Sequence, residues 1–135
     1  MQQWTDRRLG DGEWDDLVGV IVNDGVHVRA PLVYGAAPIF VDIEPDTFCM
    51  NVELVEAALT GRTKAIIAVN LFGHPARLQA LRSIADANGI YLIEDNAQAI
   101  GSVYTDSKKK KVKAGTIGHI GTTSFFPSKI PAELM

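Results

Sequence analysis

The sequence predicts an α/β fold built around a parallel β-sheet. Short apolar runs rich in Val and Ile alternate with segments whose apolar residues follow a helical period, which is the βαβ pattern. The runs are apolar at nearly every position rather than at every second one, as is typical of parallel strands buried on both faces. A chain of 135 residues fits one modest domain.

Five strands are expected in chain order. Each is a run of β-branched or aromatic residues, and most end at a turn signal such as Asn-Asp-Gly or Glu-Pro-Asp. They are expected at residues 18–23, 38–43, 65–70, 90–95 and 122–127.

Two helices are expected between the second, third and fourth strands. Asn51 is placed to cap a helix that runs through Leu59, because a short polar side chain can accept a bond from a free N–H of the first turn. Pro75 suits the first turn of the second helix, whose apolar residues then recur at i, i+3 and i+7, and Gly89 provides its end.

Composition narrows the class of protein. The net charge of −3 does not favour nucleic acid or an anionic membrane as a partner. One cysteine excludes an intrachain disulfide, and no apolar run is long enough to span a bilayer, so we expect a cytoplasmic protein. The three histidines and Cys49 lack metal-ligand spacing, so no metal site is expected. The lysine-rich stretch 108–113 is expected to be a solvated hairpin tip.

Two charged residues follow predicted strands. Asp95 ends the fourth strand and Lys129 follows the last one. Ligands of parallel sheets bind outside the carboxyl ends of the strands, where a carboxylate can pair with a protonated ring nitrogen and a lysine can form a Schiff base. The residues alone favour a plainer interpretation, in which Asp95 is a turn residue and Lys129 a solvated tail.

Four sequence blocks change that balance: PIFVDIEPDTF, TKAIIAVNLFGHPA, IEDNAQAIGS and GTIGHIGTTSFFPSK. In this order and spacing the chain resembles the DegT/DnrJ/EryC1/StrS family of sugar aminotransferases, which use pyridoxal 5'-phosphate and have the aspartate aminotransferase (type I) fold. The resemblance covers about residues 36–129. It implies part of the cofactor-binding large domain at 18–135, with the small domain absent. Residues 1–17 are polar and rich in Gly and Asp, and we expect them to form a leader or an arm.

The resemblance also implies roles for single residues. Lys129, in SFFPSK, matches the lysine that is linked to the cofactor and later moves the proton, and it favours transamination over the dehydratase branch, which has histidine there. Asp95 matches the partner of the pyridine nitrogen, Gln98 a residue beside the ring and its 3-oxygen, and Ser124 a hydroxyl that binds the cofactor phosphate. Two plainer roles stay open: Ser124 can satisfy a backbone group, and Gln98 can cap a short helix.

The functional expectation follows from the resemblance. It implies a homodimeric enzyme that transfers an amino group, with glutamate the expected donor, to a nucleotide-linked keto-sugar in amino-sugar or polysaccharide biosynthesis. The chain departs from the family pattern at both ends: no phosphate-cupping block or ring-covering aromatic precedes the matched part, and Ile-Pro-Ala-Glu-Leu-Met follows Lys129. The alternative is therefore a truncated, non-catalytic α/β remnant that associates with itself or with a full-length relative.

Overall fold

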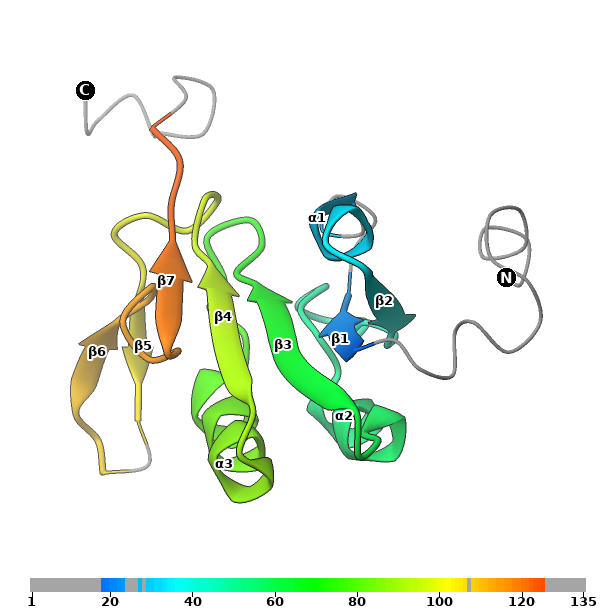
Figure 1. Cartoon of the computed structure of the whole chain (residues 1–135). Helices are drawn as coiled ribbons and strands as arrows, with labels where there is room; N and C mark the ends of the chain where they lie inside the picture. Colours follow the sequence, from blue (N-terminus) through cyan, green and yellow to red (C-terminus); the bar gives the residue numbers. More distant parts are fainter. Residues whose placement is uncertain (1–17, 24–26, 28, 107, 126–135) are drawn as a thin grey trace.

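The computed structural model describes residues 18–23, 27, 29–106 and 108–125. Within them, a five-stranded, fully parallel sheet forms the centre of the molecule (Figure 1), in the order β2-β1-β3-β4-β7. Its strands are β1 (Val18–Val22), β2 (Ala36–Phe40), β3 (Thr63–Val69), β4 (Tyr91–Asp95) and β7 (Ile120–Thr122). The predicted α/β class with a parallel sheet is therefore confirmed.

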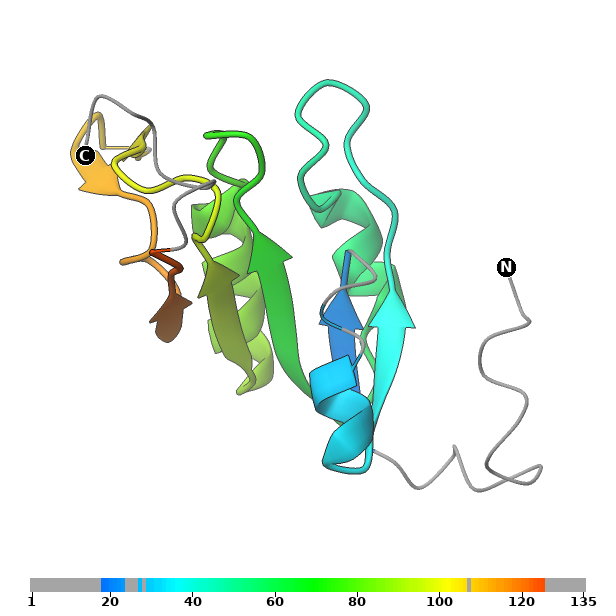
Figure 2. The same ribbon diagram turned by 90° about the horizontal axis from the view of Figure 1, so that it is seen from above.

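The helices lie on both sides of this sheet. Seen from above (Figure 2), α1 (Arg29–Val33) lies on one side, and α2 (Val52–Ala58) and α3 (Leu78–Asn88) lie on the other. The chain moves from β1 outward to β2 and then returns past β1 to β3, so its direction across the sheet reverses at this point. Right-handed crossovers that run in opposite directions place their helices on opposite faces, which explains the arrangement.

Two helix ends lie at the positions that the sequence predicts. Asn51 caps α2, with its Oδ1 accepting from the Glu53 amide at 3.0 Å, and Gly89 ends α3 in a left-handed conformation with φ 63°. Pro75 was placed wrongly, because α3 begins at Leu78 and Pro75 lies in the loop before it. The reason is that Asn70 Oδ1 holds the Ala76 amide at 2.9 Å, so the loop continues beyond Pro75 before the helix starts.

The main core lies between the sheet and the pair α2 and α3. It is built from fully buried residues of the strands, among them Ile21, Ile66 and Leu92, and of the helices, among them Val55 and Leu81. Burying each such side chain stabilises the fold by about 1.5–3 kcal/mol. Arg77 ties the two helices together at the surface: its guanidinium donates to Glu53, and this hydrogen bond lowers the pKa of that carboxyl.

A two-stranded antiparallel hairpin, β5 (Val103–Thr105) and β6 (Lys111–Lys113), follows β4 in the chain and lies on the side of β7 away from β4 (Figure 1). Asp106 Oδ1 accepts from the amides of Lys108 at 2.9 Å and Lys110 at 2.7 Å and so shapes the turn. The lysines of the turn are exposed, which confirms the expected solvated hairpin tip.

The last strand differs from its predicted position. It was expected at residues 122–127, but β7 begins at Ile120 and ends at Thr122, where it pairs with Ile93–Asp95 of β4. Residues 126 and 127 lie outside the described part. No helix in the described part of the chain is long and apolar enough to cross a membrane.

Candidate active site

The carboxyl ends of the central strands carry the polar residues of the candidate site. His27 follows β1, Asn70 follows β3, and Asp95 is the last residue of β4. β1 and β3 flank the point where the chain reverses its direction across the sheet. Crevices at such switch points are where open parallel sheets bind ligands. The strand order therefore marks this edge of the sheet as the candidate site.

Asp95 contacts His27 at this edge. The His27 Nε2 atom lies 2.8 Å from Asp95 Oδ2, and the two side chains are 19% and 20% exposed. The other carboxylate oxygen, Oδ1, accepts from the Ala97 amide at 2.8 Å. This hydrogen bond to Oδ1 fixes the plane of the carboxylate, so that Oδ2 faces the imidazole ring of His27.

The geometry of Asp95 suits a nitrogen-bearing cofactor ring. An imidazole N–H already reaches Oδ2 at hydrogen-bond distance, which shows that the site admits a planar heteroaromatic donor in this direction. A protonated pyridine nitrogen has the same donor character and would gain a charge-assisted bond. The residues present therefore fit the pyridoxal ring at this position.

A network of buried polar side chains joins the strand ends that carry the candidate site. Asn70 is fully buried, and its amide nitrogen donates to Glu94 Oε2 at 3.3 Å and to Asn96 Oδ1 at 3.2 Å. The Asn70 backbone amide donates to the Asp95 carbonyl at 2.9 Å. The ends of β3 and β4 are therefore fastened to each other by side-chain and backbone bonds, and Asp95 is held between them.

The end of β7 leaves the sheet beside Asp95. The Asn96 amide donates to the Thr122 carbonyl at 2.8 Å, and the Thr122 hydroxyl donates to the Glu94 carbonyl at 3.1 Å. Ser124 follows two residues after β7 and is half-buried. The structure thus brings Asp95 and Ser124 to the same edge of the sheet.

Gln98 lies in the turn after β4. Its side chain is exposed, and its backbone carbonyl accepts from the Gly73 amide at 2.9 Å, which joins this turn to the loop after β3. Gln98 is therefore available at the same edge. Lys129 lies outside the described residues, so its predicted role stays a prediction.

His27 is the functional candidate that the sequence reasoning missed. In the sequence its only apparent role is that of a metal ligand, and the residues around it match none of the four family blocks. The available signal was its position shortly after the end of a parallel strand, at the edge where Asp95 also ends a strand. Its contact with Asp95 spans 68 residues and could not be read from local spacing.

Comparisons with known proteins agree with this architecture. The sequence profile of the DegT/DnrJ/EryC1/StrS aminotransferase family matches residues 28–132. The dTDP-3-amino-3,4,6-trideoxy-alpha-D-glucose transaminase of Micromonospora megalomicea subsp. nigra is 39% identical over 122 residues, which are 90% of this chain and 31% of that protein. The L-glutamine:2-deoxy-scyllo-inosose aminotransferase of Streptomyces kanamyceticus is 46% identical over 95 residues, covering 70% of this chain and 21% of that protein.

Solved structures show the same likeness. A DegT DnrJ EryC1 StrS aminotransferase from Brucella abortus superposes with a TM-score of 0.73 at 40% identity, over 82% of this chain and 31% of that one. A GDP-4-keto-6-deoxymannose-3-dehydratase with a trapped PLP-glutamate geminal diamine gives a TM-score of 0.72 at 33% identity, over 84% and 29% of the two chains. These relatives support pyridoxal 5'-phosphate as the cofactor.

The similarity covers most of this chain but only part of each relative. The chain spans between about a fifth and a third of the length of the curated relatives and of the solved structures that it matches. The fold is a fragment of the type I transferase architecture, as the resemblance implied. The chain belongs to the DegT/DnrJ/EryC1/StrS aminotransferase family.

Proposed function

We propose that this chain carries the cofactor-binding part of a pyridoxal-phosphate-dependent aminotransferase that acts on a nucleotide-linked keto-sugar. The observation that carries the proposal is Asp95, whose carboxylate is fixed through Oδ1 and offers Oδ2 to a ring N–H. When bound, the cofactor supplies an electron sink for a carbanion, and a protonated ring strengthens that sink. Membership in an aminotransferase family, several of whose members are named for nucleotide sugars, supports the substrate class.

Each residue then has one task in the proposed site. Asp95 holds the ring nitrogen in its protonated form, because an adjacent carboxylate favours the charged state of a base. Ser124 offers a hydroxyl to the phosphate and Gln98 an amide beside the ring. Lys129 would bond the cofactor through its ε-amine and carry the proton during transfer.

The amino donor and the assembly are part of the same proposal. Glutamate is the proposed donor, and its presence in the name of one structural neighbour supports it. The relatives named for L-glutamine make that amino acid the competitor to test. We also propose a homodimer, and a cytoplasmic location in which nucleotide sugars are available.

Borohydride trapping tests the proposal. The protein is incubated with pyridoxal 5'-phosphate and reduced, and the modified lysine is located by mass spectrometry. We expect selective labelling at Lys129 that is lost in Asp95→Ala, because the ring is then no longer held. Asp86→Ala, which removes an exposed aspartate of α3, is the control and should leave the labelling unchanged.

The opposite outcome has an equally definite meaning. Labelling spread over Lys108–Lys111 and Lys113, or no labelling, would contradict cofactor binding at Asp95. It would favour the second candidate, an α/β unit that acts only by associating with itself or with a longer relative. If Lys129 is labelled, the amino donor is tested next, by comparing amino transfer from glutamate with amino transfer from glutamine.

A further inference from the structure

His27 occupies the atom of Asp95 that the proposed function assigns to the cofactor. The imidazole is held at 2.8 Å from Oδ2, and about four-fifths of both side chains is removed from solvent. Because a carboxylate oxygen accepts, the Nε2 atom carries the proton of this bond. The contact joins the segment after β1 to the end of β4, across β3.

We propose that His27 competes with the cofactor ring for Asp95 Oδ2, so that the cofactor-free site is closed by a side chain of this chain. This inference rests on the proposed function, because it assumes that the cofactor ring pairs with Asp95. It assigns His27 as a competing residue: its imidazole occupies Oδ2 in the cofactor-free protein and must leave that oxygen when the cofactor enters.

The arrangement of Asp95 makes the competition direct. Oδ1 is already bonded to the Ala97 amide, so the carboxylate cannot turn to offer its second oxygen without losing that bond. The hydrogen bond from the imidazole to Oδ2 must therefore break before the ring nitrogen of the cofactor can take its place. The observed affinity for the cofactor is then reduced by the fraction of molecules in which His27 holds the site.

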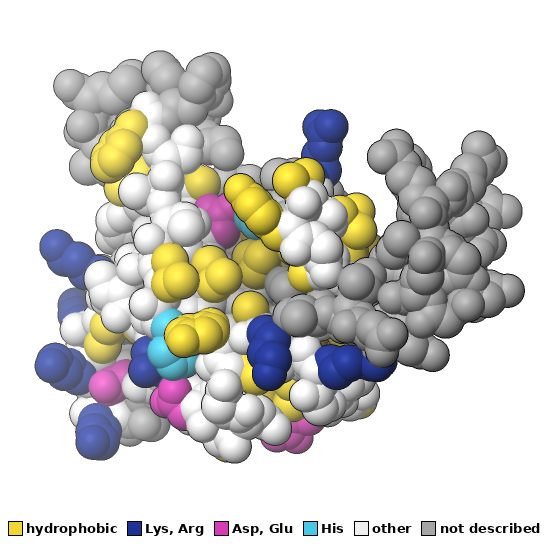
Figure 3. All heavy atoms as spheres, viewed as in Figure 1, with side chains coloured by type: hydrophobic (Ala, Val, Ile, Leu, Met, Phe, Trp, Pro, Cys, Tyr) yellow, Lys and Arg dark blue, Asp and Glu magenta, His cyan; other side chains and the backbone are white. Residues whose placement is uncertain are grey.

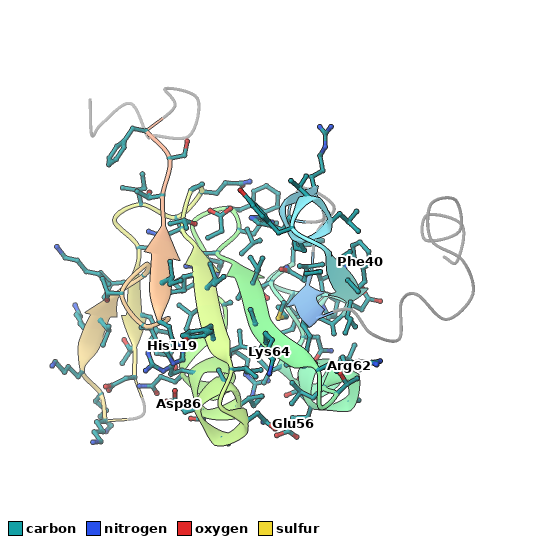
Figure 4. The ribbon with its side chains drawn as sticks, in the orientation of Figure 1. Phe40, Glu56, Arg62, Lys64, Asp86 and His119 are labelled. Carbon is teal, nitrogen blue, oxygen red and sulfur yellow. The ribbon has the colours of Figure 1, made fainter. Side chains whose placement is uncertain are left out.

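A second histidine–aspartate contact in the chain provides a matched control. His119 Nε2 lies 3.1 Å from Asp86 Oδ1, between the start of β7 and the end of α3 (Figure 4). This pair involves the same chemical groups but none of the candidate site residues. A change that acts through Asp95 should therefore affect His27 and leave His119 unaffected.

The test uses pyridoxamine 5'-phosphate, which has the ring and the phosphate but no aldehyde and so cannot form a link with a lysine. Its dissociation constant is measured by titration calorimetry for the wild type, His27→Phe, His27→Gln and His119→Phe. Phenylalanine keeps a ring but cannot donate to Asp95, whereas glutamine keeps an N–H donor. We expect the dissociation constant to fall about tenfold in His27→Phe and to stay near the wild-type value in His27→Gln and His119→Phe.

A second measurement observes the histidine side chains of the wild-type protein directly. The chain has only three histidines, so their imidazole signals can be followed separately by NMR. Addition of pyridoxamine 5'-phosphate should move the His27 signal, because its bond to Asp95 is lost, and leave His74 and His119 in place. Asp95→Asn, without any ligand, should move the same His27 signal.

Three results would overturn the inference: a His27 signal that does not move while the ligand binds, an affinity that is unchanged or weaker in His27→Phe, or no binding in any of the proteins. The proposed function fails separately. Pyridoxamine 5'-phosphate that displaces His27, combined with no borohydride label at Lys129, would keep the competition at Asp95 and reject the lysine chemistry.

Discussion

Glu94 shows how much one residue can fix at the site. Its side chain is fully buried, and its two carboxylate oxygens accept from the amides of Gly115 at 2.6 Å, Ile117 at 2.6 Å and Gly118. These three donors belong to the loop that leads into β7. The carboxylate therefore holds that loop against β4, one residue before Asp95.

Replacement of Glu94 should be among the most damaging changes in the chain. Glu94→Ala leaves buried amides without an acceptor, and we expect a loss of about 3 kcal/mol or more in the free energy of unfolding. Glu94→Gln keeps the shape but turns an N–H toward these donors, and should cost at least about 1 kcal/mol. Urea unfolding measures both, with Glu56→Gln on the exposed face of α2 as the control. Equal stability of Glu94→Ala and the control would mean that the loop does not depend on this carboxylate.

At the scale of the elements, His119 fastens the start of β7. The Leu92 amide donates to His119 Nδ1 at 2.9 Å, and the His119 amide donates to the Leu92 carbonyl at 2.8 Å. Its ring also lies edge-on to Tyr91, with centroids 5.6 Å apart. β7 has only three residues, so these contacts extend its pairing with β4 beyond the strand itself.

We expect His119→Ala to loosen this end of the β4–β7 ladder. The Leu92 amide then loses its acceptor, and its hydrogen exchange should accelerate by about fivefold, corresponding to one lost bond of about 1 kcal/mol. His119→Asn should restore part of the protection, because its side-chain oxygen can accept in place of Nδ1. Native-state exchange followed by NMR gives the measurement. An unchanged Leu92 rate in His119→Ala would show that β7 is held by its strand pairing alone.

The sequence predicted those elements whose causes are local. The apolar runs of β1, β3 and β4, the Asn51 cap and the Gly89 end each depend on a few neighbouring residues, and the structure has them within two residues of the expected positions. The strand expected at 38–43 lies earlier, at Ala36–Phe40, because its pairing with β1 begins at Ala36. β7 was misplaced because the aromatic residues after Thr122 favour a strand by propensity, whereas the actual strand contains Gly121. A Cβ at Gly121 would overlap the carbonyl of Gly115, and this close approach of two backbones leaves no signal in strand propensity.

The same limit applies to the candidate site. Asp95 could be found because it ends a strand, and Lys129, Gln98 and Ser124 because they match a known pattern. His27 depends on a contact between segments that are brought together only by the order of the strands. In the sheet, β2 lies on one side of β1, at the edge, and β3 lies on the other side. Packing of the whole sheet sets this strand order, and the spacing of residues along the sequence does not reveal it.

At the scale of the whole molecule, the residues that the structure describes cover the two faces of the sheet unequally. The face toward α2 and α3 carries the main core, whereas the other face has a small buried cluster, Val22 and Ile67, with Ile93 packed against it. Tyr91 is 60% exposed and Ile120 50% exposed. Hydrophobic side chains gather across this view of the surface (Figure 3).

Such a surface should drive association of the isolated chain, because contiguous exposed apolar area favours burial against another surface. We expect the sedimentation coefficient to rise with protein concentration. The double variant Tyr91→Lys and Ile120→Lys should weaken this association about tenfold or more, since each buried apolar side chain contributes about 1–2 kcal/mol. Leu54→Lys, a change of the same kind at a 41% exposed residue of α2 on the other face, is the control and should leave the association intact. Equal weakening by Leu54→Lys would mean that charge, rather than this face of the sheet, governs the association, and a concentration-independent monomer would contradict the prediction outright.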